Sequence, residues 1–249
     1  MGYDTTTIVT IMLVFTLAGM IKGVVGLGLP PVVLGLLTTV IGIHSAMSMV
    51  ALPAFLTNIY QAVTGKHARS LSREHWLFFM SATVSVGVGC WLALMVDTAY
   101  MSFCLGVLLS LYAVTGLFNV RLSVRAKWQN AFGLAMGTCN GIFTGLTGSS
   151  AVPGVFYLQS AGLPKEKLVQ AMGILFTFSS AGLMLGLFLQ NILTFAASGL
   201  SLLALLPAFI GMAMGGRIRQ RLSVIVFQRI FFSSLLLLGV YIIISQLKL

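Results

Sequence analysis

Lys22 lies in a strongly apolar stretch, and four glycines and two adjacent prolines follow it in the run GMIKGVVGLGLPPVVLGLL. Glycines loosen a helix and Pro30 with Pro31 suits the first turn of a new one, so the run predicts a helix that breaks and restarts. A restarting helix exposes N–H groups and a partial positive charge, which favour a bound anion. Because burying a lysine in a bilayer costs roughly 3 kcal/mol or more, we expect Lys22 to add charge to this anion site. The structural alternatives for Lys22 are snorkelling to an interface or pairing with a carbonyl.

A second run, TGLTGSSAVPG from Thr144 to Gly154, repeats this arrangement with hydroxyl side chains before a proline. Serine and threonine often cap helices, so we expect them to cap a short helix that starts near Pro153. Both half-helices are expected to face a shared central cavity, with glycines permitting close approach. The predicted substrate-binding residues are Lys22, Gly23, Gly26, Gly28, Asn58, Asn140, Thr144, Gly145, Thr147, Gly148, Ser149, Ser150, Gln170 and Thr177.

Three of these residues, Asn58, Gln170 and Thr177, are polar positions inside apolar runs. For each of them, an interhelical hydrogen bond explains the residue as well as contact with a substrate does.

The elements that carry these residues must lie in a bilayer. The chain has 249 residues, of which 58% are hydrophobic and 7% charged, and its mean hydropathy is +1.05. Soluble domains carry roughly 25% charged residues. Apolar runs of about 20 residues recur from end to end, so we expect a single transmembrane domain over residues 1–249.

The basic residues predict how this domain is oriented. Lysines and arginines cluster in short segments at 65–74, 120–128, 163–167 and 217–222, which are typical of cytoplasmic loops. Asp97 and the link at Gln190–Asn191 then fall outside, and both termini are expected outside. Scattered loops do not form the contiguous basic face that nucleic acid requires, so the net charge of +10 is not taken to indicate nucleic-acid binding.

The apolar runs form two similar sets. They cover 8–43, broken near 23–31, then 45–64, 75–96 and 100–119, followed by 129–162, broken near 147–153, then 166–189, 193–215 and 224–246. Residues recur at offsets of 118 to 120, which aligns Lys22 with Asn140 near the membrane mid-plane and indicates a duplication of about 1–120 onto about 129–249. Three full spans follow each interrupted segment, so the second half must run opposite to the first. The expected fold is an all-α polytopic membrane protein with inverted-topology repeats and broken or re-entrant segments in each half.

Enzyme chemistry is not expected. Ser150 would need a buried base to act as a nucleophile, whereas the histidines are expected in loops or at span ends, at His44, His67 and His75. No cofactor or metal is expected, because the three cysteines have no C-x-x-C spacing. A membrane thiol-redox or assembly factor is an alternative that would require two of them to meet from different spans: Cys90, Cys104 and Cys139.

The two glycine-rich runs also carry a family resemblance. GMIKGVVGLGLPPVVLGLL and GTCNGIFTGLTGSSAVPGVFYLQSAGLPKEKLVQAMG resemble the paired motifs of the TauE/SafE sulfite exporter family, also called the 4-toluene sulfonate uptake permeases, and the likeness covers essentially the whole chain. The resemblance implies secondary transport of sulfite, sulfonates or related organic acids across a bacterial cytoplasmic membrane. The chain has GLGLPP and TGSSAVP where the family commonly has consecutive glycines before a proline, which puts sulfite itself in doubt.

We therefore expect a secondary transporter of sulfite, a sulfonate or a related organosulfur anion that works by alternating access. A short-carboxylate transporter and an anion channel are the alternatives. The expected partners are the small anionic substrate and the lipid bilayer, with a homodimer left open and no nucleic acid.

Overall fold

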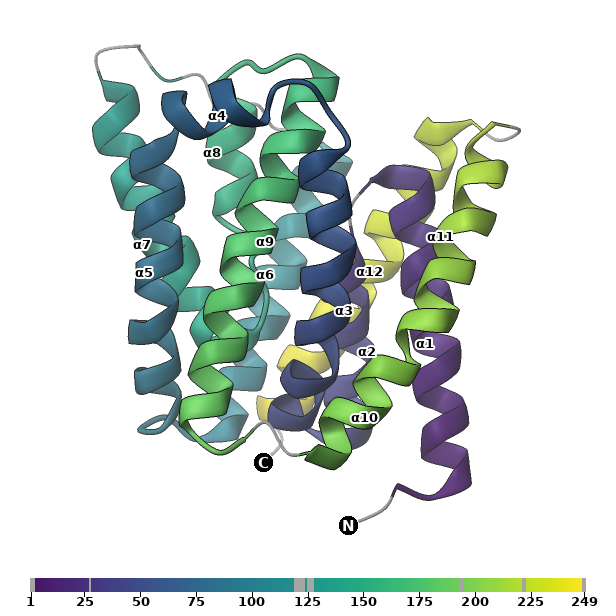
Figure 1. Cartoon of the computed structure of the whole chain (residues 1–249). Coiled ribbons are helices and arrows are strands. Elements are labelled where there is room, and N and C mark those ends of the chain that lie inside the picture. The colour runs from purple at the N-terminus through teal and green to yellow at the C-terminus, as the bar shows by residue number, and fades with distance from the viewer. Residues whose placement is uncertain are drawn as a thin grey trace. The chain divides into compact units, whose positions relative to one another are not determined.

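The computed structural model describes residues 3–26, 28–118, 124, 128–192, 195–220 and 223–247 (Figure 1). Its helices are α1 (Thr5–Val25), α2 (Leu29–Ile41), α3 (Ile43–Val63), α4 (Ala68–Glu74), α5 (Trp76–Ala93), α6 (Thr98–Leu117), α7 (Gln129–Thr147), α8 (Gly154–Ser160), α9 (Lys165–Leu189), α10 (Phe195–Leu203), α11 (Leu205–Arg219) and α12 (Val224–Leu247). The described residues contain no strand, so the predicted all-α class is confirmed.

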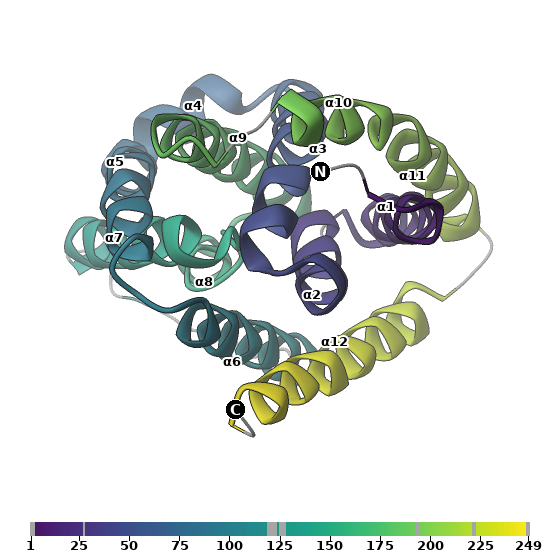
Figure 2. The same cartoon turned by 90° about the horizontal axis from the view of Figure 1, so that it is seen from below.

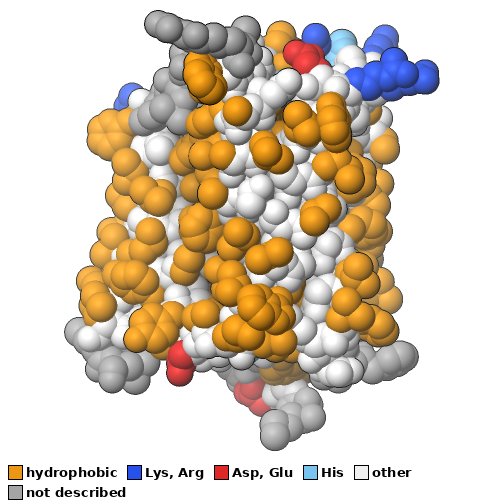
Figure 3. Space-filling view, turned by 90° about the vertical axis from the view of Figure 1, so that its left-hand side faces the viewer, with side chains coloured by type: hydrophobic (Ala, Val, Ile, Leu, Met, Phe, Trp, Pro, Cys, Tyr) orange, Lys and Arg blue, Asp and Glu red, His pale blue; other side chains and the backbone are white. Residues whose placement is uncertain are grey.

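Among the described residues, seven segments are long and apolar enough to cross a membrane: 5–25, 43–63, 76–93, 98–117, 166–189, 199–219 and 225–247. A helix rises about 1.5 Å per residue, so about 20 residues match a hydrocarbon core of about 30 Å. Hydrophobic side chains cover most of the face in Figure 3, and Lys and Arg side chains gather at its upper end. A multi-pass membrane protein with the predicted spans is therefore confirmed.

The two interrupted segments are present where the sequence predicts them. The first consists of α1 and the 13-residue α2, and the second of α7 and the seven-residue α8. Leu27, within the first break, lies outside the described residues, as does most of the basic segment 120–128.

The chain divides into two compact units, and each takes segments from both halves of the sequence. Unit 1 comprises residues 1–53, 98–119 and 191–249, and unit 2 comprises residues 54–97 and 120–190. The division runs through α3 between Pro53 and Ala54.

Within unit 1, α1 packs tightly along α11, and α6 lies beside α12 (Figure 2). A Cβ atom at Gly23 would lie only 2.3 Å from the carbonyl oxygen of Met212, and one at Gly215 would lie 2.1 Å from that of Met20. Small residues let the two helix backbones approach this closely, which is the common means of joining helices in lipid. The contacts advance together along both helices, so α1 and α11 are parallel and the end of α1, not its start, lies near Arg217.

Unit 2 contains a comparable crossing between α5 and α7 (Figure 2). A Cβ at Gly145 would lie 2.4 Å from the carbonyl oxygen of Val86, and one at Gly89 would lie 2.2 Å from that of Ile142. The contacts again advance together along both helices, so α5 and α7 are parallel too.

The end of α3 is joined to the start of α9 by two glutamine side chains. Gln61 Nε2 donates to the carbonyl oxygen of Val169, and Gln170 Nε2 donates to that of Ala62, each over 2.8 Å. These bonds bring the basic segment at 65–74 to the same end of unit 2 as the start of α9, in agreement with the predicted sidedness. Which end faces the cytoplasm stays a prediction.

Candidate functional site

The second break begins where α7 ends. Gly148 follows Thr147 with φ 76°, and its N–H donates to the carbonyl oxygen of Thr144 over 2.7 Å. A positive φ at the residue after a helix is the usual glycine termination, because a Cβ is disfavoured there. Gly148 therefore ends α7 at the break that the sequence predicts.

The chain then turns back along α7 before α8 starts. The N–H of Gly154 donates to Oδ1 of Asn140 over 2.9 Å, and both residues are buried. Asn140 precedes the end of α7 by seven residues, about 10 Å at the normal helical rise. The loop from Gly148 to Pro153 therefore runs back along α7, and α8 starts about two turns before the level at which α7 ends.

This bond corrects one prediction. The N-cap residue of α8 is Pro153, which makes no side-chain cap bond, and no hydroxyl of the preceding loop caps the helix. Asn140 from α7 supplies the cap instead. The first N–H groups of α8 are thus occupied, since Val155 donates to Ala151 and Tyr157 to Pro153.

The loop itself holds donors that the described chain leaves without an acceptor. Ser149 and Ser150 are 2% and 5% exposed, and their hydroxyl groups make no hydrogen bond to any described residue. Over the same part of the chain, no hydrogen bond has the N–H of Ser150, Ala151 or Val152 as its donor. Neither serine hydroxyl oxygen is fully enclosed, so these groups are accessible to a partner from outside the chain, such as water or an anion.

Asn140 adds a further donor at the same place. Its Oδ1 is fixed as the acceptor from Gly154, so its amide nitrogen Nδ2 carries the two N–H groups. Nδ2 is fully buried and has no hydrogen-bond partner within the described residues. An amide nitrogen and backbone N–H groups can only donate, so the missing partner must be an acceptor, such as the oxygen atoms of an anion.

Other predicted binding residues of unit 2 have hydrogen-bond partners within the chain. Three threonine hydroxyls donate to a backbone carbonyl of their own helix, in the pairs Thr144–Asn140, Thr147–Phe143 and Thr177–Gly173. Gln170 uses both ends of its amide, because its Oε1 accepts the N–H of His67 over 3.0 Å. The face of Gly145 is closed by α5, and Asn58 is fully buried in α3.

The first break lies in unit 1 and has a similar backbone. Gly26 follows α1 with φ 84° and donates its N–H to the carbonyl oxygen of Lys22 over 2.7 Å. Gly28 also has a positive φ, and Pro30 and Pro31 occupy the first turn of α2 as predicted. Prolines have no N–H, so this helix start offers fewer donors than its geometry alone would allow.

Lys22 is 4% exposed, so protein covers its side chain. It is the fourth residue from the end of α1, which is itself as long as a full span, and therefore lies within about 5 Å of that end. The depth of Lys22 in the bilayer stays a prediction. Counted from the glycines that end α1 and α7, Lys22 corresponds to Thr144, whereas the sequence offsets align it with Asn140. The face of Gly23 is closed by α11.

Sequence reasoning missed one buried pair in unit 2. His75 was expected in a loop or at a span end, and it does lie between α4 and α5, but it is only 2% exposed. Its Nδ1 lies 3.0 Å from the hydroxyl group of Tyr157 on α8. The two residues are 82 positions apart, so no local spacing could have paired them.

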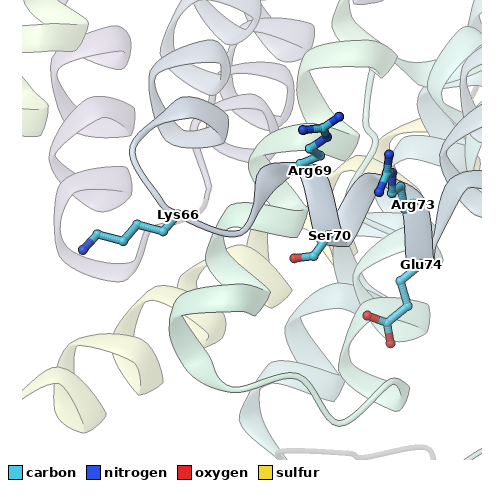
Figure 4. A pocket seen from close by; sticks show the side chains of 5 residues that line it. All are labelled: Lys66, Arg69, Ser70, Arg73 and Glu74. Atoms are coloured by element: carbon cyan, nitrogen blue, oxygen red, sulfur yellow. The ribbon is translucent and has the colours of Figure 1, made fainter.

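A shallow pocket over α4 gathers the exposed charges (Figure 4), and Lys66, Arg69, Ser70, Arg73 and Glu74 line it. Arg69 and Arg73 point the same way, one turn apart, while Glu74 points to the other side. Within the described chain neither arginine forms an ion pair. Their exposure suits contact with anionic headgroups at the membrane surface.

Comparison with known proteins gives one match. The family model described as "Sulfite exporter TauE/SafE" matches residues 11–242. No curated protein and no solved structure matches the chain.

Proposed function

The chain belongs to the TauE/SafE sulfite exporter family, and we propose that it transports a small organosulfur anion that binds at its second helix break. The observation that carries this proposal is the surplus of donors there: Asn140 Nδ2, the hydroxyls of Ser149 and Ser150, and the N–H groups of residues 150–152. Five of these donors belong to the loop itself and the sixth faces it from α7. We infer that the loop lies inside the membrane, where an unpaired donor costs several kcal/mol. An anion supplies the acceptors that the chain lacks.

The number of donors favours sulfite or a sulfonate over a carboxylate. A sulfite or sulfonate group presents three oxygen atoms, whereas a carboxylate presents two. Six donor groups on Asn140, Ser149, Ser150, Ala151 and Val152 exceed what two oxygens accept comfortably. A short carboxylate remains the second candidate, and it would leave more of these donors unpaired.

We further propose that the two halves of the chain are inverted repeats and that transport proceeds by alternating access. Each interrupted segment ends its first helix on a positive-φ glycine bonded four residues back, at Gly26 and Gly148. Each first helix also crosses a helix from the other half through paired glycines, Gly23 with Gly215 and Gly145 with Gly89. These matched devices support a duplication more strongly than the sequence offsets alone do.

Uptake by proteoliposomes tests the proposed substrate. Radiolabelled sulfite should enter vesicles that contain the protein, and unlabelled methanesulfonate should compete better than acetate. Sulfite should also raise the melting temperature of the purified protein, because a ligand that binds the native state stabilises it. The carboxylate alternative would be established if acetate were taken up and raised the melting temperature of the protein, while sulfite and methanesulfonate did neither.

A paired set of variants tests the location of the site. The double variant Ser149→Ala/Ser150→Ala should weaken sulfite binding and leave the melting temperature without ligand unchanged. Ser179→Ala is the matched control, because Ser179 is a buried serine of the same unit whose hydroxyl is also without a partner among the described residues. Equal sulfite affinity in the double variant and the control would exclude the second break as the binding site.

A further inference from the structure

We propose that His75 and Tyr157 form a proton-binding site that positions α8, so that protonation of His75 loosens the second break. The proposal rests on the proposed function, because α8 directly follows the loop from Gly148 to Pro153 that holds the unpaired donors. His75 is a positioning residue in this account, and it acts on the anion site through Tyr157.

The pair is held in an aromatic cluster. Phe78 stacks on the ring of Tyr157 with centroids 4.2 Å apart, and Phe79 meets the His75 ring edge-on at 6.5 Å. Gly133 of α7 brings its backbone against the Tyr157 ring, where a Cβ would lie 2.9 Å from the hydroxyl oxygen. Tyr157 is 2% exposed, so the 3.0 Å contact with His75 Nδ1 is shielded from water.

The second ring nitrogen of His75 explains why the pair is a proton site. Nε2 is buried and has no hydrogen-bond partner within the described residues. In the tautomer that can take up a proton without losing this contact, Nδ1–H donates to the Tyr157 oxygen and Nε2 carries a free lone pair. That lone pair accepts one proton from water and gives an imidazolium ion, with Nδ1–H unchanged.

The imidazolium ion is poorly accommodated in this position. Burial lowers the pKa of His75 below its ordinary value, and the neighbouring Glu74 carboxylate opposes that shift only in part. A protonated ring therefore gains by moving toward water, and this movement breaks its bond to Tyr157.

The charged groups around His75 agree with this assignment. Glu74 and Arg73 belong to α4, and Glu74 points away from Arg73 (Figure 4). On α8 the titratable group is Tyr157 itself, while α5 and α7 carry only cysteines. Glu74 is the charged group that acts on His75.

Two bonds to neighbouring helices fix α8. Gly154 is held by Asn140 at the start of the helix, and Tyr157 is held by His75 one turn later. Loss of the second bond leaves packing contacts and the bond from Gly154 to Asn140, the residue that lines the proposed anion site. Protonation of His75 should therefore increase the mobility of α8 and change anion affinity together.

Hydrogen–deuterium exchange of residues 154–160 between pH 5 and pH 8 tests the proton site without any anion. After correction for the intrinsic exchange rate, exchange in the unchanged protein should rise roughly fivefold as the pH falls below about 6.5, as expected for losing one neutral hydrogen bond. His75→Asn keeps a nitrogen near the Nδ1 position and cannot titrate, so its α8 exchange should not depend on pH. His67→Asn, on the same segment, should behave like the unchanged protein.

Tyr157→Phe provides a second test that preserves the stacked ring. Its α8 exchange should match the acidic level of the unchanged protein at every pH. Persistent pH dependence in either His75→Asn or Tyr157→Phe would overturn the proposal. If the exchange data follow expectation but sulfite does not bind, the proton site stands and the proposed function fails.

Discussion

Both helix breaks end on a positive-φ glycine, but the second presents a surplus of donors whereas the first presents a buried cation and two prolines. In the second break, Asn140 caps α8 from outside the loop, and the hydroxyl groups of Ser149 and Ser150 have no partner among the described residues. In the first, Pro30 and Pro31 remove N–H groups, and Lys22 is the polar group that remains. The same backbone device thus carries two different sets of polar groups, and each would attract an anion in a different way.

The largest effect is expected at the glycine crossings, because the first helix of each break packs closely against another helix through glycines. Gly89→Leu and Gly215→Leu should each destabilise the protein by about 3 kcal/mol, because the new side chain would meet the backbone of α7 or α1. The controls are Gly87→Leu and Gly216→Leu, whose added atoms meet open space. Thermal unfolding in detergent measures all four. A tolerant Gly215→Leu beside an intolerant Gly89→Leu would show that the two crossings are not equivalent.

The second largest effect is expected from Asn140→Leu, which changes only the second break. Leucine leaves the Gly154 N–H without its acceptor, at a cost of about 2 kcal/mol in stability, and removes the amide donor from the anion site. Sulfite binding, measured by calorimetry, should be lost in this variant. Full binding would place the anion elsewhere than the second break.

Lys22→Met sharpens the comparison from the other side. Methionine retains the apolar stem and removes the charge, so folding should persist while anion binding weakens by about 2 kcal/mol if the first break also attracts the anion. Affinity equal to that of the unchanged protein, in a well-folded variant, would confine anion recognition to the second break.

The smallest effects are expected from single hydroxyl deletions. Ser149→Ala and Ser150→Ala should each weaken sulfite binding by about 1 kcal/mol, the usual value of one hydrogen bond, with no change in thermal stability. A loss of stability without a loss of binding would mean that these hydroxyls serve the fold.

The sequence predicted the helices and breaks because hydropathy, proline and glycine act locally. Gly26 and Gly148 end their helices through local backbone conformation, which does not depend on the rest of the chain. An apolar run of span length can be recognised from its own residues. The counterpart of Lys22 in the proposed repeat depends on how the two segments are matched. The sequence offsets pair it with Asn140, whereas counting back from Gly26 and Gly148 pairs it with Thr144.

Tertiary contacts were beyond the reach of such patterns. Asn140 caps a helix 14 residues later, and His75 meets Tyr157 across 82 residues. Nothing in the spacing of an isolated histidine separates a solvated loop position from a buried one. The sequence predicts that Gly23 and Gly145 let the substrate approach closely. In the structure, the groups that approach these two glycines are the backbones of neighbouring helices.

The hydroxyl groups of Ser149 and Ser150 make no hydrogen bond within the described residues, and this has a consequence for evolution. A hydroxyl group that bonds nothing in its own chain can be exchanged for another small side chain without lowering the folding free energy. If the anion binds at the second break as proposed, changes at Ser149 and Ser150 can alter which anion is accepted, while Asn140 and the glycine crossings preserve the scaffold. Divergence in substrate range is expected to concentrate at these two positions.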